Sequence, residues 1–321
     1  MDIETGIGIV MNHWVKVQPE ELIHLITDET HMAEAEAMER WATSHGAILK
    51  TTMVPSALVQ NGDILENLAH QLSFADVIIG ATDYSFITTD AVRQATAKGA
   101  RFLSLPLSCT DGSSLLEQDF IAMDTRWTAH AAKGLLRRFN RCSSIRVVSP
   151  AGTDLHLSKK GRKGTFFNGI AGKKGTLSSA SFECCIPIVE TATNGELWLD
   201  ASLGYLGSIR HPFPVTFREG RLLCTDQSPD ALRLREYIES FHDSMMWFSG
   251  EFGIGLNTLA RCRGLSYIED ESAYGTFHIG MGRNLALGGQ QNAAGHFDLI
   301  AYRPTIYADD TLLMLEGRLL I

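Results

Sequence analysis

The first 145 residues alternate short apolar runs with stretches of helical periodicity, and this pattern restricts the fold more than any other feature of the sequence. The runs end at glycines or polar turns, as strands do when a helix follows each of them. The predicted strands are 21–27, 47–54, 76–80 and 101–105. The predicted helices between them cover about 31–44, 63–72 and 90–98. This alternation predicts a parallel, doubly wound, Rossmann-like α/β sheet.

The turn after the first predicted strand argues against a nucleotide site in this sheet. It reads Asp28-Glu-Thr-His31, whereas a dinucleotide-binding turn carries the spacing Gly-x-Gly-x-x-Gly. The sequence also lacks a phosphate-binding Gly-x-x-x-x-Gly-Lys-Ser/Thr motif. We therefore assign no nucleotide to this sheet, and we expect His31 to face solvent on its helix.

The sequence changes in character near residue 145. Beyond that point glycine turns become frequent and the predicted strands are short. These strands are 144–148, 154–157, 197–200, 214–218, 221–224, 298–302, 305–308 and 311–321. A hairpin is predicted at Asp309-Asp310, between the last two. We therefore expect a Rossmann-like α/β domain over 1–145 and a β-rich α+β domain over 146–321.

Composition excludes several classes of partner. The net charge is −9, which argues against binding to a nucleic-acid backbone. No apolar run approaches the roughly 20 residues that span a bilayer, and the N-terminus does not resemble a secretion signal. The six cysteines form no Cys-x-x-Cys pair, which is typical of reduced thiols in a cytoplasmic protein. Adjacent Cys184 and Cys185 would point to opposite faces of a strand, so we interpret them as packing residues.

The segment 249–298 concentrates metal-ligating side chains among glycines. It contains Glu251, His278, His296 and Asp298, each close to a glycine that lets the backbone approach a bound ion. His296 and Asp298 are two residues apart, so on a strand they face the same side. Two imidazoles and two carboxylates suit Zn, Mn, Co or Fe(II). We therefore predict a divalent metal site in the β-rich domain.

Two polar groups near these residues have two interpretations each. The acidic run Glu269-Asp270-Glu271 is expected to be a solvated turn, with the alternative that one carboxylate orients a ligand histidine. Arg283 and Asn284 directly follow the predicted His278 strand and are candidates to hold a substrate carboxylate. Structural hydrogen bonding to the glycine turns is the alternative for both.

The order Glu-Phe-Gly-Ile-Gly-Leu-Asn, Glu-Asp-Glu-x-x-x-Gly-Thr-Phe-His-Ile-Gly-Met-Gly and His-Phe-Asp over 251–298 resembles the aminopeptidase T and aminopeptidase S family of leucyl aminopeptidases. Upstream, Gly152-Thr-Asp-Leu-His-Leu and Ser181-Phe-Glu-Cys-Cys-Ile-Pro are similar to that family as well. The resemblance runs from about residue 13 to the end. It implies a homodimer that holds two divalent metals, with Glu251 also near the attacking water. The implied ligands are Glu183, Glu251, His278, His296 and Asp298.

The same superfamily contains 2,5-dihydroxypyridine dioxygenase, a mononuclear Fe(II) branch that uses two histidines and one aspartate. That branch carries a histidine where this chain has Glu251, which favours the hydrolase. The aminopeptidases are longer and carry a tyrosine at the position of Leu285, which favours the other branch. Our first hypothesis is a metallohydrolase that acts on a peptide or amide carbonyl of a small molecule or short peptide. The alternative is a ring-cleaving Fe(II) dioxygenase with Glu251, His296 and Asp298 as a modified triad. A binding protein without chemistry is the third hypothesis.

Overall fold

The computed structural model describes residues 1–56 and 64–320. Its contacts divide the chain into two compact units. Unit 1 consists of residues 1–123 and 167–181, and unit 2 consists of residues 124–166 and 182–321. The two domains predicted from the sequence, 1–145 and 146–321, share one boundary, whereas the chain crosses between the units three times.

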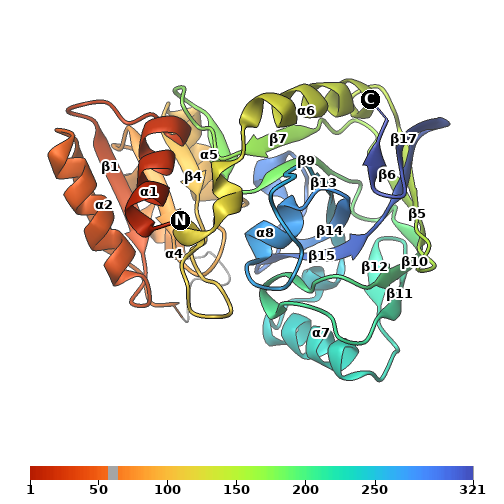
Figure 1. Cartoon of the computed structure of the whole chain (residues 1–321). Helices are drawn as coiled ribbons and strands as arrows, with labels where there is room; N and C mark the ends of the chain where they lie inside the picture. Colours follow the sequence, from red (N-terminus) through yellow and green to blue (C-terminus); the bar gives the residue numbers. More distant parts are fainter. Residues whose placement is uncertain (57–63, 321) are drawn as a thin grey trace. The chain divides into compact units, whose positions relative to one another are not determined.

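Unit 1, in which Figure 1 labels α1, α2, β1 and β4, is built on a parallel sheet with the strand order β2-β1-β3-β4-β8. The strands are β1 (Leu22–Thr27), β2 (Ile48–Met53), β3 (Val77–Ala81), β4 (Arg101–Ser104) and β8 (Leu177–Ser179). The α-helices are α1 (Ile3–Gly8), α2 (Met32–Ser44), α4 (Ile64–Leu72) and α5 (Asp90–Ala97). The π-helix Ile9–Trp14 and the 3-10 turns Leu115–Glu117 and Asp119–Ala122 complete the unit. The predicted parallel α/β sheet is confirmed.

Burial follows the position of each strand in this sheet. Strands β3 and β4 have neighbours on both sides and every one of their residues is buried. Strand β2 lies at the edge, and its side chains are exposed or half-buried. Continuous apolar runs are typical of central parallel strands covered on both faces. The prediction for His31 is wrong, because this residue precedes α2 and its side chain is buried at 5% exposure.

Unit 2 contains two sheets, ordered β12-β11-β10-β6-β5-β16-β17-β18 and β15-β14-β13-β9-β7. The strands of the first are β5 (Ser144–Val148), β6 (Asp154–Ser158), β10 (Asn194–Leu199), β11 (Phe213–Arg218), β12 (Arg221–Leu223), β16 (Thr305–Ala308), β17 (Thr311–Leu315) and β18 (Arg318–Leu319). The strands of the second are β7 (Thr165–Asn168), β9 (Phe182–Pro187), β13 (Ser249–Gly255), β14 (Thr276–Gly282) and β15 (His296–Tyr302). Strand β7 lies where the chain crosses between the units.

Helices and one continuous core complete unit 2. Its α-helices are α6 (Thr125–Phe139), α7 (Pro229–Ser240) and α8 (Tyr267–Ser272), and its 3-10 turns are Gly204–Leu206, Ser244–Trp247 and Leu285–Leu287. Apolar side chains from both sheets, α6 and α7 form a single buried cluster. The predicted hairpin joins β16 to β17 through Asp309, whose φ is +48°. Within the described parts of the chain, no helix is long and apolar enough to cross a membrane.

The acidic run on α8 is buried, so the prediction of a solvated turn is wrong. Glu269 forms an ion pair with Arg263 of the loop before α8, with Oε2 and Nη2 3.0 Å apart. Asp270 is fully buried, and one of its oxygens accepts hydrogen bonds from the backbone N–H groups of Arg263 (2.9 Å) and Gly264 (3.0 Å). The helix therefore tethers the loop before it through two carboxylates, and a third, Glu271, remains for other contacts.

Burial of Asp270 predicts a pH-dependent stability. Burial raises the pKa of this carboxyl from 3.8 to about 6, although hydrogen bonds to Ser202 and the loop backbone lower it. A raised carboxyl pKa means that the folded state loses stability as pH rises through this window. In Asp270→Asn the group cannot ionise and its oxygen can still accept both backbone bonds. The stability of the variant relative to wild type should therefore increase between about pH 4 and about pH 6 and level off above this range.

Denaturant unfolding at several pH values measures this difference. Asp310→Asn, a change at an exposed hairpin position, is the matched control. A difference between Asp270→Asn and wild type that stays constant with pH would contradict the assignment.

Candidate functional site

The five predicted ligands lie on neighbouring strands of the sheet β15-β14-β13-β9 in unit 2. They are Glu183 on β9, Glu251 on β13, His278 on β14, and His296 and Asp298 on β15. Cross-strand pairing places all five on the same face of the sheet. The residues between them on these strands point the other way, and most of these belong to the hydrophobic core of unit 2. One face therefore packs the core while the other presents carboxylates and imidazoles.

Glycines in the sheet give these side chains their space. Gly280 is paired with Glu251 on one side and with Asp298 on the other. A Cβ atom at Gly280 would lie 2.7 Å from Cβ of Glu251 and 2.8 Å from Cε1 of His296. Gly253 is paired with His278, and a Cβ atom there would lie 1.9 Å from Nε2 of that ring. Neither position has room for a side chain, so the glycines form a cradle in which the polar groups converge.

Glu251, His296 and Asp298 form the first group of this site. Nε2 of His296 lies 3.3 Å from Oε2 of Glu251 and 3.5 Å from Oδ1 of Asp298. One ligand atom from each of the three residues lies within 4.8 Å of the other two. Nδ1 of His296 is 2.9 Å from the carbonyl oxygen of Arg283, to which it donates. This bond fixes the orientation of the ring and directs Nε2 towards the carboxylates.

Glu183, Cys185 and Glu251 form a second group that shares Glu251 with the first. One ligand atom from each of these three residues also lies within 4.8 Å of the other two. Nε2 of His278 is 2.9 Å from Oε2 of Glu183. Cys185 was not predicted to be here, although the opposite-face argument for the two cysteines holds, because Cys184 lies in the core. Burial and the charges of Glu251 and Glu183 raise the pKa of the Cys185 thiol, which stays protonated.

The carboxylates of the site attract positive charge. Burial by itself lowers the pKa of both imidazoles, but the charge of Glu183 raises that of His278 to about 9 and the charge of Asp298 raises that of His296 to about 10. Burial raises the pKa of Asp298, yet the two histidines bring it below its ordinary value. Within the part of the chain that the structure describes, Glu251 and Asp298 form ion pairs only with His296.

Glu271 supports Asp298 from α8. Burial and the charges of Glu183 and Asp298 raise the pKa of Glu271 well above its ordinary value, so the carboxyl is protonated. A protonated carboxyl has an O–H donor, and Glu271 hydrogen-bonds to Asp298. The sequence offered the α8 acids as supports for a ligand histidine, whereas the one in contact with the site holds a ligand carboxylate.

Asn284 and Arg283 lie beside the site and have different surroundings. The amide nitrogen of Asn284 donates to Glu190 (2.9 Å) and to the carbonyl of Gly250 (2.8 Å), and its oxygen accepts from the backbone of Gln291 at 2.9 Å. This is the structural role that the sequence left open. The Arg283 side chain is buried, and its carbonyl orients His296. Its role as a substrate-binding residue stays a prediction.

Two solved structures share the whole fold. The structure of 2,5-dihydroxypyridine dioxygenase from Pseudomonas putida KT2440 matches with a TM-score of 0.81 and 19% identity, over 99% of this chain and 96% of that chain. Wild-type AmpT from Thermus thermophilus matches with a TM-score of 0.70 and 13% identity, over 99% of each chain. The chain therefore has the same fold as these two proteins.

Sequence comparison identifies the family of the chain. No curated protein sequence matches the chain. One family model, described as NicX, 2,5-dihydroxypyridine 5,6-dioxygenase, matches residues 13–321. The match spans both units and includes all five predicted ligands, and it supports an enzyme. The chain belongs to the 2,5-dihydroxypyridine 5,6-dioxygenase (NicX) family.

Proposed function

We propose that the protein is a metal-dependent dioxygenase that opens a hydroxylated nitrogen-containing aromatic ring, as the name of its family describes. The observation that carries the proposal is the family match over residues 13–321 together with the group Glu251, His296 and Asp298. The metallohydrolase, which the sequence placed first, becomes the second candidate. The ring-cleaving alternative takes its place.

The residues of the first group fit a divalent ion. They offer one imidazole and two carboxylates, and non-haem Fe(II) oxygenases use a related triad of two imidazoles and one carboxylate. Oδ1 of Asp298 is buried and receives no hydrogen bond from the described residues. The glycine cradle at Gly280 leaves the space between the donors free of side chains. Bound iron would supply the redox chemistry by which dioxygen and an aromatic ring combine.

The protein's own groups would orient the substrate and move its protons. Glu183 and His278 form a buried carboxylate–imidazole pair whose Nε2 and Oε2 are 2.9 Å apart. Such a pair can hold a proton at Nε2 and exchange it with a hydroxyl group of a bound ring. The buried face that surrounds them keeps bulk water away from the reacting groups, which strengthens each electrostatic contact. In this assignment Glu183 and His278 are acid–base residues and not ligands.

A two-metal hydrolase is the second candidate because Glu251 belongs to both ligand groups. A carboxylate shared by two ions can hold them about 3.5–4 Å apart, the separation typical of two-metal hydrolases. In that assignment Glu183 and His278 hold a second ion next to the first. The two functions therefore differ in the role of His278, which is an acid–base residue in the dioxygenase and a metal ligand in the hydrolase. Metal content can measure this difference.

Metal content of two variants separates the candidates. For the dioxygenase we expect about one iron per chain at the residues of unit 2 in protein loaded anaerobically with Fe(II), counted as the iron that Asp298→Asn loses, and oxygen uptake with 2,5-dihydroxypyridine as the test substrate. His278→Gln should keep that iron and lose most of the oxygen uptake, whereas Asp298→Asn should lose both. Elemental analysis and an oxygen electrode measure these outcomes. About two ions per chain at the residues of unit 2, of which His278→Gln loses one, would instead support the hydrolase arrangement.

The glycine cradle gives a second prediction. Gly280→Ala places a methyl group 2.7 Å from Cβ of Glu251 and 2.8 Å from His296, so the ligands must separate. We expect metal affinity to fall at least about 10-fold with an unfolding temperature within a few degrees of wild type. Gly8→Ala is the matched control, since only Asn12 comes within 4 Å of its new methyl group. Unchanged metal affinity in Gly280→Ala would remove the cradle from the site.

The hydrogen bond from Glu271 to Asp298 gives a third prediction. Glu271→Gln retains an N–H donor, whereas Glu271→Ala removes the donor altogether. Loss of a group that orients a metal ligand typically weakens metal binding about 10- to 100-fold. We expect Glu271→Ala to show this loss and Glu271→Gln to retain most of the affinity, as measured by competition with a chromophoric chelator. Equal affinities in the two variants would show that donation to Asp298 has no role in metal binding.

A further inference from the structure

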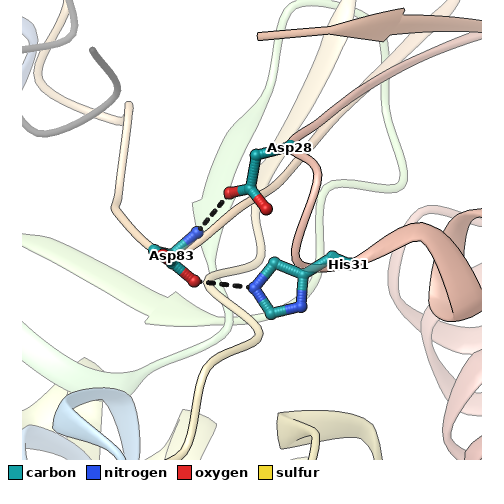
Figure 2. Close-up of side chains that lie close together, drawn as sticks. All are labelled: Asp28, His31 and Asp83. Carbon is teal, nitrogen blue, oxygen red and sulfur yellow. Dashed lines mark hydrogen bonds and ion pairs between the residues drawn. The ribbon is translucent and has the colours of Figure 1, made fainter. Parts of the chain in front are cut away.

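A second group of metal-ligating residues lies in unit 1, at the carboxyl ends of its parallel strands. Asp28 directly follows β1, His31 is three residues further on, and Asp83 is the second residue after β3. One ligand atom from each lies within 4.8 Å of the other two. Figure 2 shows the three side chains gathered around one point, with His31 and Asp28 reaching towards Asp83 from the β1–α2 turn.

The position of this group in the sheet is one at which parallel α/β folds bind ligands. Strand β1 pairs with β2 on one side and with β3 on the other, so the order of the strands reverses between β1 and β3. The loops after β1 and β3 leave the sheet in different directions there, and ligands of open α/β sheets bind in the crevice that results. Asp28 and Asp83 lie on either side of this point. The turn after β1 has no glycine-rich phosphate loop, so its chemistry is that of carboxylates and an imidazole.

The histidine of the group is held in the orientation of a metal ligand. Its Nε2 is 2.9 Å from Oδ1 of Asp83 and 3.1 Å from the hydroxyl of Ser108. Its Nδ1 is 3.5 Å from Oε1 of Glu34 on the first turn of α2. A carboxylate behind the second ring nitrogen is the usual support of a ligand histidine. The ring therefore presents Nε2 to Asp83, and Glu34 stabilises it from behind.

The charges of this group are not balanced by the protein. Asp28, Glu34 and Asp83 contribute three carboxylates around one imidazole, and Asp28 is fully buried. Among the described residues, no lysine or arginine forms an ion pair with any of the three. Buried carboxylates without a cation are costly. The surroundings favour positive charge, because Oδ1 of Asp83 lies 2.9 Å from Nε2 of His31 and Oε1 of Glu34 lies 3.5 Å from its Nδ1.

From these observations we propose that Asp28, His31 and Asp83 bind a divalent transition-metal ion, of the kind represented by Zn²⁺. The ion takes the place of the hydrogen bond between Nε2 of His31 and Oδ1 of Asp83, which are 2.9 Å apart. Oδ1 of Asp28 accepts two hydrogen bonds, both from Thr30, whereas its Oδ2 accepts one, from the backbone of Asp83 (3.0 Å), and keeps a lone pair for a metal. This site is independent of the proposed function and of the five residues in unit 2.

Diffraction from crystals of the wild-type full chain, soaked in Zn²⁺ and measured at the zinc absorption edge, tests the proposal without any variant. We expect an anomalous peak about 2.0–2.3 Å from His31 and from both aspartates. A map with zinc only at the residues of unit 2, or with no zinc, would overturn the proposal. The result does not depend on whether the protein is a dioxygenase.

A solution experiment tests the same site by stoichiometry. Zn²⁺ is titrated calorimetrically into chelator-treated Asp298→Asn protein, with circular dichroism to verify the fold. We expect His31→Gln and Asp83→Asn each to remove one bound Zn²⁺ per chain from this background. The change His130→Gln on α6 is the control, because that residue is exposed. Equal stoichiometry with folded His31→Gln or folded Asp83→Asn would contradict the proposal.

The supporting carboxylate provides a graded test. Glu34→Gln keeps all three ligands and removes the charge behind Nδ1 of His31. We expect the stoichiometry to stay unchanged and the affinity to fall about 10- to 100-fold. A purely structural hydrogen-bond network would leave zinc binding unaffected by this change.

Discussion

The structure of unit 2 depends on the burial of carboxylates that the chain must neutralise. Glu183, Glu251, Glu271 and Asp298 are almost completely withdrawn from solvent on or beside one sheet face. An isolated buried carboxylate is unstable, so each group needs a proton, a cation or hydrogen bonds. Glu271 keeps its proton, while Glu183 and Asp298 lie beside histidines. The remaining carboxylates outnumber the two histidines, so the face carries an excess of negative charge. This excess makes the face suitable for a metal ion.

The same strands that carry this charge also form the core, which explains how the site keeps its shape. Phe252, Phe277 and Phe297 are fully buried on the opposite face of β13, β14 and β15. A shift of any strand by one residue would bring a phenylalanine to the polar face and a ligand to the core. The register is therefore fixed by hydrophobic packing, and the ligands inherit their positions from it. Sites on such rigid elements hold their geometry better than sites on loops.

Features that depend on residues close together in the sequence could be predicted, whereas features that depend on contacts between distant residues could not. The parallel strands of unit 1 and the shared face of His296 and Asp298 follow from local periodicity, and both are present. Convergence of Glu183 with the other four required a family resemblance, because no local rule brings β9 beside β13. The burial of α8 and of His31 was missed, because it depends on partners such as Arg263 and Asp83 that sequence spacing does not reveal. The return of residues 167–181 to unit 1 is non-local for the same reason.

Glu251 is the position at which the resemblance seen in the sequence distinguishes the two branches by charge. The resemblance places a histidine of the dioxygenase branch at this position, so this chain brings one more negative charge to the first ligand group. An anionic ligand binds a hard cation more strongly than a neutral imidazole does, and it stabilises the higher oxidation state of a bound iron. Glu251 also contacts the second group through Cys185 and Glu183. A neutral histidine would bring no negative charge to either group, so Glu251 is the residue through which the charge of the two groups is coupled.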